Sequence, residues 1–147
     1  KVKTGKSFLA PWQGGFGTTL TWKGISLAAQ FSWVADRWVF NNDRYLDEGN
    51  GLFETYNQSS RLLYDRWKKP GDVTDIPRYG VTPQMDSRFL EDASFLRLKN
   101  LMLSYNFPQA LLKKTNFLTH LRVFVQGQNL LTFTKFSGLD PEGGSNM

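Results

Sequence analysis

The sequence lacks several residue types that would point to common classes of function. Its 147 residues include no cysteine and a single histidine, His120. The absence of cysteine excludes disulfides, thiolate metal sites and a cysteine nucleophile, and one histidine excludes a histidine-rich zinc site. Uninterrupted apolar runs are only a few residues long, far short of the roughly 20 residues that a membrane-spanning helix needs.

Charge is also scarce, whereas aromatic residues are abundant. Charged residues make up 21% of the sequence and the formal net charge is +5. The cations are scattered along the chain rather than gathered in one stripe, which favours a solvated surface over a nucleic-acid-binding face. Aromatic residues make up 15%, so either a large core or extensive aromatic surfaces must accommodate them.

Four stretches alternate apolar and polar residues with the two-residue period of a β-strand. They span residues 15–22, 25–35, 93–107 and 121–133. Only Lys23 and Gly24 separate the first two stretches, which predicts a two-residue hairpin turn with the glycine at positive φ. In the third stretch the apolar residues change from even positions (Leu96, Leu98) to odd positions from Leu101 onward. A β-bulge would restore a single face, and a boundary between two environments would also explain the change.

A long polar connection, residues 41–92, joins the second and third strands. Within it, Thr55 to Lys68 has apolar residues at helical spacing, a capping-box pattern formed by Thr55 and Gln58 at its start, and Pro70 beyond its end. This pattern predicts a short helix. A connection of this length inside a compact domain usually carries function.

The order of short turn, long loop and short turn is typical of an outer-membrane β-barrel. The strand lengths suit a tilted membrane crossing, and aromatic residues lie near the strand ends. A soluble sandwich or barrel also alternates apolar and polar residues, so the pattern by itself leaves both architectures open.

Several sequence motifs resemble those of the SusC/RagA family, which are TonB-dependent outer-membrane transporters of Bacteroidetes. Residues 92–101 read DASFLRLKNL and residues 121–130 read LRVFVQGQNL, close to two motifs near the C-terminus of that family. Upstream, GGFGTT at residues 14–19 and WKG at residues 22–24 resemble the family's hairpin, and residues 66–67 and 74–78 resemble its external loop.

The resemblance implies an all-β fold: a fragment of a 22-stranded antiparallel transmembrane β-barrel with a short helix in a long extracellular loop. Residues 1–147 are then the C-terminal part of the barrel, with the plug domain and the last strand absent. The resemblance places the loop 41–92 outside the cell and the turns at 23–24 and 108–119 in the periplasm.

By the same resemblance, the function is TonB-dependent import of oligosaccharides or peptides across the bacterial outer membrane. The partners are a SusD-like surface lipoprotein, TonB through an N-terminal region, and the lipid of the outer membrane. No enzymatic activity, cofactor, metal or nucleic acid is expected, and this segment supplies barrel wall and an external recognition loop. The alternative is a soluble β-rich carbohydrate-binding module. A hydrolase using His120 is a weaker hypothesis, because no nucleophile-elbow sequence accompanies the histidine.

Aromatic residues in or beside the long loop are the candidate contacts for a ligand or a partner. Such rings stack on sugar faces and anchor protein interfaces, although they also pack against one another. The candidates are Trp38, Tyr45, Tyr56, Tyr64, Trp67 and Tyr79.

Charged residues suggest two further expectations. Asp43, Asp47 and Glu48 lack EF-hand spacing, so a solvated loop is favoured there over a calcium site. Arg97, Lys99 and Arg122 are expected to point away from lipid, because a charge at the middle of the bilayer costs about 2–4 kcal/mol.

Overall fold

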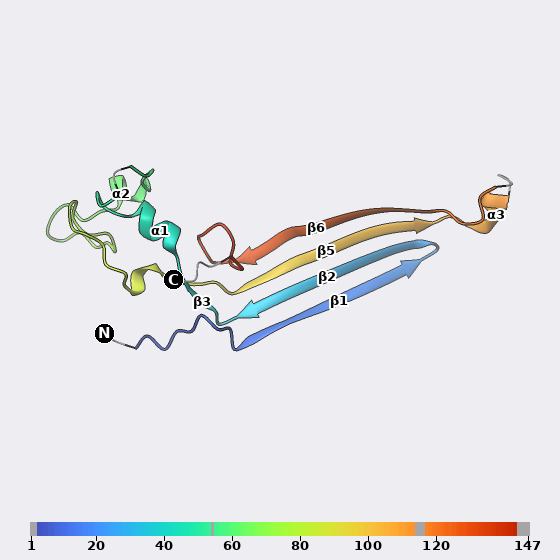
Figure 1. Cartoon of the computed structure of the whole chain (residues 1–147), viewed down its shortest axis with the longest axis horizontal. Coiled ribbons are helices and arrows are strands. Elements are labelled where there is room, and N and C mark those ends of the chain that lie inside the picture. The colour runs from blue at the N-terminus through green and yellow to red at the C-terminus, as the bar shows by residue number, and fades with distance from the viewer. Residues whose placement is uncertain (1–2, 54, 114–116, 144–147) are drawn as a thin grey trace. The chain divides into compact units, whose positions relative to one another are not determined.

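The computed structural model describes residues 3–53, 55–113 and 117–143, and it is mostly β-strand with a few short helices (Figure 1). The elements in order are β1 (Trp12–Trp22), β2 (Ile25–Ala35), β3 (Trp38–Phe40), α1 (Asn42–Asp47), α2 (Arg61–Tyr64), the 3-10 helix η1 (Ser87–Phe89), β4 (Leu90–Asp92), β5 (Phe95–Asn106), α3 (Gln109–Leu112) and β6 (Arg122–Thr134). None of the helices in these ranges has the length and apolarity to cross a membrane.

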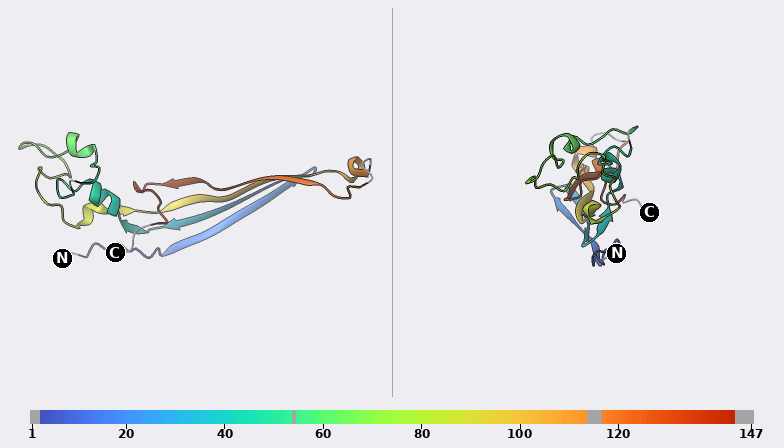
Figure 2. Two further views of the ribbon diagram at one scale, coloured as in Figure 1. Left: turned by 45° about the horizontal axis from the view of Figure 1, so that its top comes forward. Right: turned by 90° about the vertical axis from the view of Figure 1, so that its left-hand side faces the viewer.

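The chain divides into two compact units. The strand unit comprises residues 11–35 and 94–134, and the loop unit comprises the described parts of residues 1–10, 36–93 and 135–147. In the strand unit, β1, β2, β5 and β6 form one antiparallel sheet in that order, and the four strands lie side by side in Figure 1 and in the left-hand view of Figure 2.

The predicted hairpin between β1 and β2 is confirmed. Trp22 pairs with Ile25, and the two turn residues have positive φ, 46° at Lys23 and 89° at Gly24. Two successive residues at positive φ form the turn whose twist matches the strands on either side. A Cβ at Gly24 would lie 2.8 Å from the carbonyl oxygen of Asn106, so the neighbouring strand also requires glycine here.

A β-bulge in β5 explains the change of phase in the sequence. The β2–β5 ladder pairs Phe31 with Leu98 and Gln30 with Asn100, so Lys99 is the inserted residue. One extra residue returns the following side chains to the original face. Of the two explanations that the sequence left open, the bulge is therefore the correct one.

The adjacent strand β6 has a matching irregularity opposite the bulge. Asn129 has a φ of 51°, and the β5–β6 register shifts around it. A Cβ on Gly127 would lie 2.8 Å from the Leu130 side chain, which therefore occupies the space that glycine leaves. The shift places Leu130 on the same face as Gly127, where simple alternation puts it on the opposite face.

With these shifts the sheet has one continuous apolar face. It carries Trp12, Phe16, Leu20, Trp22, Ile25, Leu27, Phe31, Trp33, Leu96, Leu98, Leu101, Leu103, Tyr105, Val123, Val125, Leu131 and Phe133. Many of these side chains are exposed, with Trp12 and Trp22 each 68% accessible and Val125 73% accessible. In the described strand unit this face is therefore an external surface and not the inside of a closed core. A soluble module would bury this face in a core, and no such core forms among the described residues of the strand unit.

The opposite face is mainly amide and hydroxyl side chains. Gln126 donates to the Asn100 side-chain oxygen at 2.9 Å, and Arg122 donates to the Ser104 hydroxyl at 3.0 Å. The register places Arg97 on this face, opposite Ser32 and Thr132. Arg97 and Arg122 therefore point away from the apolar face, as the sequence predicted, and Lys99 lies at the bulge.

In the loop unit, the helix expected from Thr55 to Lys68 is wrong in its extent. Only α2, Arg61–Tyr64, is α-helical in this range. The Gln58 side-chain amide donates to the Phe53 and Tyr56 carbonyls, whereas the glutamine of a capping box accepts from the N–H of the N-cap residue. Residues 57–60 read NQSS, and Asn and Ser side chains compete with the helix for backbone hydrogen bonds. The Ser59 hydroxyl, for example, accepts from the Arg61 N–H at 3.3 Å.

A second helix, α1, was not predicted from the sequence. Asn41 is its N-cap, and the Asn41 side-chain oxygen accepts from the Arg44 N–H at 3.0 Å. Before this helix, β3 pairs with β4 through Trp38 with Asp92 and Phe40 with Leu90. This short ladder closes the base of the long connection, which makes the loop unit a folded element with its own small core.

Candidate functional site

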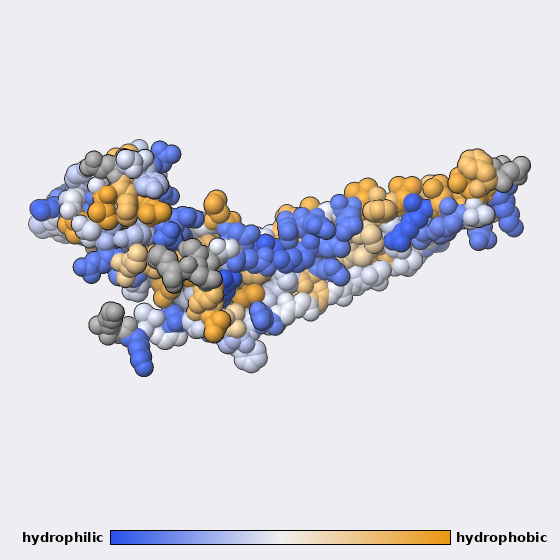
Figure 3. All heavy atoms as spheres, in the orientation of Figure 1, coloured by the Kyte–Doolittle hydropathy of each residue, from blue (hydrophilic) through white to orange (hydrophobic). Residues whose placement is uncertain are grey.

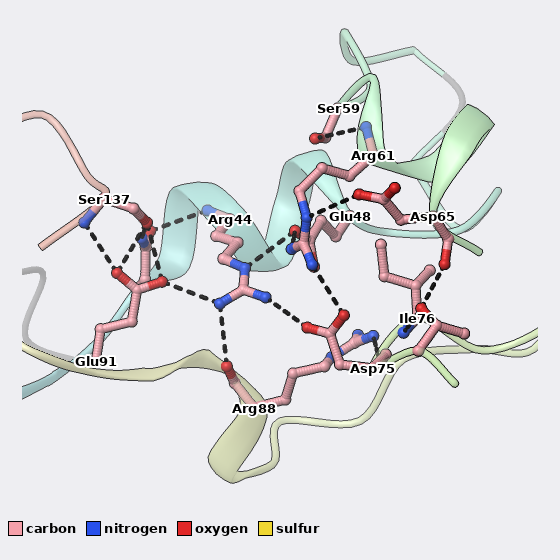
Figure 4. Close-up of polar contacts among 12 residues, drawn as sticks. Arg44, Glu48, Ser59, Arg61, Asp65, Asp75, Ile76, Arg88, Glu91 and Ser137 are labelled. Carbon is pink, nitrogen blue, oxygen red and sulfur yellow. Dashed lines mark hydrogen bonds and ion pairs between the residues drawn. The ribbon is translucent and has the colours of Figure 1, made fainter. Parts of the chain in front are cut away.

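The most elaborate polar feature of the loop unit is an ion-pair cluster around Arg44 (Figure 4). The Arg44 guanidinium donates to Glu48 at 3.0 Å, to Glu91 at 3.1 Å and to Asp75 at 2.9 Å. It also donates to the Arg88 carbonyl oxygen at 3.3 Å. One side chain of α1 thus joins two segments that are distant in the sequence, one at Asp75 and one at residues 88–91.

Glu48 is the buried anion of this cluster, with 1% of its surface exposed. Its position four residues after Arg44 puts both side chains on one face of α1. A second arginine, Arg61 at the start of α2, donates to the same Glu48 oxygen and to Asp75 at 2.8 Å. The other Glu48 oxygen, Oε2, is buried with no hydrogen-bond partner among the described residues. The expectation of a solvated acidic loop is therefore wrong for Glu48, whereas Asp43 and Asp47 are exposed.

Glu91, at the centre of β4, connects the cluster to the segment that follows β6. The Ser137 N–H donates to Glu91 Oε2 at 3.0 Å, and the Ser137 hydroxyl lies 2.9 Å and 2.8 Å from the two carboxylate oxygens. The Asn41 side chain donates to the same hydroxyl at 3.0 Å. Glu91 therefore holds α1 through Arg44 and the later segment through Ser137.

These contacts change the pKa values of the Glu91 carboxyl group and the Arg44 guanidinium group. Burial disfavours the charged form of Glu91, but the Ser137 N–H and hydroxyl and the Arg44 guanidinium outweigh it, and the pKa of Glu91 is lowered. Burial likewise opposes the charge on Arg44, but the carboxylates of Glu48 and Glu91 outweigh it and raise the pKa of Arg44. Both groups are therefore ionised at neutral pH.

The lowered pKa of Glu91 predicts an acid-induced loosening of the loop unit. The ionised carboxylate contributes its full stabilisation above the unfolded pKa of about 4.3, and this is lost as the pH falls through the lower folded value. We expect amide hydrogen exchange in residues 37–48 and 135–138 to be constant from pH 6 to 8, after correction for intrinsic rates, and to accelerate only below about pH 4.

The matched variants are Glu91→Gln, which removes the ionisable group, and Asp43→Asn, which removes an exposed carboxylate of α1. Glu91→Gln should show fast exchange already at pH 7 and little further change in acid. Asp43→Asn should behave as the wild type. Acid-induced exchange that is unchanged in Glu91→Gln would rule out Glu91 as its cause.

A groove of about 540 Å³ lies against this cluster. Its lining combines side chains of α1 with residues from α2 and from the segment after β6. They are Asn41, Asp43, Arg44, Asp47, Glu48, Ser59, Arg61, Glu91, Lys135, Ser137 and Gly138. Carboxylates and cations both line the groove, which suits a polar ligand carrying donors and acceptors. In the described residues, no three Asp, Glu or His side chains are grouped so as to hold a metal ion.

Two of the aromatic candidates, Tyr45 and Tyr56, belong to one packed cluster. The Tyr45 ring centroid lies 5.3 Å from that of Phe89 and 5.8 Å from that of Phe53, and Phe53 lies 6.2 Å from Tyr56. Edge-on ring pairs at these distances stabilise a fold. Tyr45 thus packs within the loop unit, whereas Tyr56 remains 58% exposed.

The other four candidates lie at separate places on the loop unit. Tyr64 in α2 is 75% exposed, and Tyr79 is 61% exposed with the Arg66 guanidinium 5.4 Å from its ring. Trp67 lines a second cavity, of about 570 Å³. The Trp38 ring lies 3.3 Å from the Lys6 ammonium. The six residues therefore do not form one aromatic platform, and the charged groove is a feature that sequence periodicity did not reveal.

The sequence signal for the groove was present but incomplete. Arg44 and Glu48 have the spacing of an ion pair on a helix, yet the helix itself was not predicted. Asp75, Glu91 and Ser137 join the pair only through the tertiary fold. The single histidine, His120, is exposed two residues before the start of β6.

The chain is similar to a segment of TonB-dependent receptors. No family model matches the sequence, but curated relatives do. TonB-dependent receptor P3 of Formosa agariphila is 36% identical over 87% of this chain, and receptors P26 and P39 of that organism are 30% and 27% identical over 89% and 93%. The chain spans 12% to 14% of the length of these relatives.

Comparison with solved structures shows which TonB-dependent transporters this chain resembles in both sequence and fold. A chain of the RagAB peptide importer in its open-open state is 44% identical, with a TM-score of 0.86 over 96% of this chain and 15% of that chain. A chain of the RagAB peptide transporter is also 44% identical, with a TM-score of 0.87, and the match covers 96% of this chain and 16% of that one. The chain is thus a SusC/RagA-like region of the TonB-dependent transporter family.

Proposed function

We propose that this chain forms part of the wall of an outer-membrane β-barrel that imports nutrients with energy from TonB. The apolar face of the sheet carries this proposal. β1 has 11 residues, and the steps between them, at about 3.3 Å each, add up to about 33 Å. Tilted by about 40°, the strand crosses about 25 Å, the height of the apolar band of outer-membrane barrels. Trp12 and Trp22, at its two ends, would lie in the two aromatic girdles.

The four strands would then be consecutive members of a 22-stranded barrel within a longer protein. The outer strands of the described sheet, β1 and β6, would pair with neighbouring strands, since an unpaired strand edge is too costly in lipid. The long connection 41–92 would lie outside the cell, and the short turns would lie in the periplasm. A plug inside the barrel would couple the transporter to TonB.

We further propose that the cargo is peptide and that the transporter works with a SusD-like surface lipoprotein. The similar solved chains come from a peptide importer, and they are 44% identical to this chain. The loop unit would supply the external recognition surface, with the exposed rings of Tyr56, Tyr64 and Tyr79 available to the partner. The role is that of a transporter wall and not of an enzyme.

Uptake by cells tests the proposal. A strain expressing the full-length transporter with its lipoprotein should accumulate fluorescent oligopeptides, and deletion of either gene should abolish accumulation. Oligosaccharides of similar mass serve as the comparison. Accumulation of oligosaccharides but not peptides would overturn the peptide assignment, and recovery of the protein outside the outer-membrane fraction would overturn the proposed function.

A further inference from the structure

Charge is distributed very unevenly between the two units. All 13 acidic residues of the chain lie outside residues 11–35 and 94–134, which form the strand unit. The same two ranges contain six lysine and arginine residues. The short-turn end of the sheet therefore has lysines and no carboxylate of its own to neutralise them.

One lysine lies directly beside the last aromatic row of the apolar face. The strand register aligns Trp22, Ile25, Tyr105 and Val123 across the sheet. The Lys23 ammonium lies 4.8 Å from the Trp22 ring, which is itself 68% exposed. A tryptophan and a lysine at the edge of an apolar surface form the usual arrangement at the boundary between lipid tails and headgroups.

A second lysine lies at a cavity in the connection between β5 and β6. This cavity, of about 390 Å³, is lined by Gln109, Leu112, Lys113, Phe117, Leu118 and Thr119. Leu112 is buried, whereas Phe117 is 80% exposed. Figure 3 shows apolar residues gathered over α3 and hydrophilic residues beside them. A lining that combines three apolar residues with a lysine and two uncharged polar residues suits an amphiphile with an apolar chain and an anionic head.

We propose that the short-turn end of the sheet binds an anionic phospholipid, with Lys23 and Lys113 contacting headgroup phosphates. This inference rests on the proposed barrel, in which the short turns face the periplasm and therefore meet the phospholipid leaflet. The ammonium groups complement the phosphate charge, and the exposed rings of Trp22 and Phe117 contact the acyl and glycerol region. The lipid supplies the anion that the strand unit lacks.

The test uses the full-length transporter purified in a neutral detergent and titrated with phosphatidylglycerol, with binding measured by native mass spectrometry. Phosphatidylcholine and lipid A are titrated in parallel. We expect phosphatidylglycerol to bind more tightly than phosphatidylcholine. Each lysine-to-glutamine substitution should weaken phosphatidylglycerol binding by about fivefold, because one lysine near an anionic surface contributes about that factor.

The test variant is Lys23→Gln with Lys113→Gln, and the control is Lys68→Gln with Lys69→Gln, two exposed lysines of the loop unit. The control should keep the wild-type preference. Equal binding of the two phospholipids, tighter binding of lipid A, or an unchanged preference in the test variant would each overturn the inference. Peptide uptake by the same transporter is measured separately, so failure of lipid binding and failure of import are distinguishable.

Discussion

Replacing Ala29 with arginine is expected to prevent folding into the membrane, whereas the same replacement at Ala28 is expected to be tolerated. The two alanines are adjacent in the middle of β2 and point to opposite faces of the sheet. Ala29 pairs with Thr18 and Leu101 on the apolar face, and Ala28 pairs with Thr19 and Met102 on the other. An arginine facing lipid near mid-bilayer costs about 2–4 kcal/mol, whereas an arginine facing a wet interior does not.

The measurement is the fraction of full-length protein recovered folded in the outer-membrane fraction, read from the heat-dependent shift of barrels on gels. Ala29→Arg should reduce this fraction by at least tenfold, and Ala28→Arg should leave it within twofold of the wild type. If Ala28→Arg were the more damaging substitution, the assignment of the two faces would be wrong. Ala29→Ser and Ala28→Ser control for the loss of each alanine itself.

Replacing Arg44 with methionine is expected to destabilise the loop unit by about 3 kcal/mol. Removing one member of a buried ion pair leaves the remaining charge uncompensated, at a cost of about 3–5 kcal/mol. We expect the lower end of this range because the Arg44 side chain is 21% exposed and because Arg61 still contacts Glu48 after the substitution. Glu91 and Asp75 would lose the same cation.

Native-state hydrogen exchange of the full-length protein measures this effect by region. Exchange in α1, β4 and the Ser137 segment should accelerate by about two orders of magnitude, and exchange in β2 and β5 should not change. Lys69→Met, which removes an exposed cation of the loop unit, is the control. Uniform acceleration across strands and loop would show that Arg44 stabilises the whole protein and not the loop unit alone.

Short-range patterns in the sequence predicted the sheet well, because a strand alternates its side chains by local geometry. Lys23 and Gly24 encode their turn through backbone sterics alone, and every odd position of β2 is apolar. The same reasoning fails at a bulge, since one inserted residue reverses the alternation. Strict alternation from Val123 and Val125 would put Leu130 on the polar face, yet Leu130 lies beside Gly127 on the apolar face.

The loop unit was predicted less well, because its order depends on contacts between distant residues. The sequence pattern predicted a helix from Thr55 to Lys68, but only α2 forms in this range. Asn and Ser side chains near the start of the pattern satisfy backbone groups without a helix. The six aromatic candidates all lie in the loop unit. Their separation into a packed cluster around Tyr45 and exposed rings such as Tyr64 depends on which of them reach Phe53 and Phe89.

The sequence by itself determined the strands, the hairpin and the family resemblance, because alternation, turn chemistry and motifs are properties of neighbouring residues. It also determined what the absence of cysteine and of long apolar runs excludes. Only the tertiary structure decided which faces remain continuous across the bulges and how Arg44, Asp75, Glu91 and Ser137 meet. These four residues span more than half of the chain, and an ion pair depends on distance in space, which no spacing along a sequence specifies.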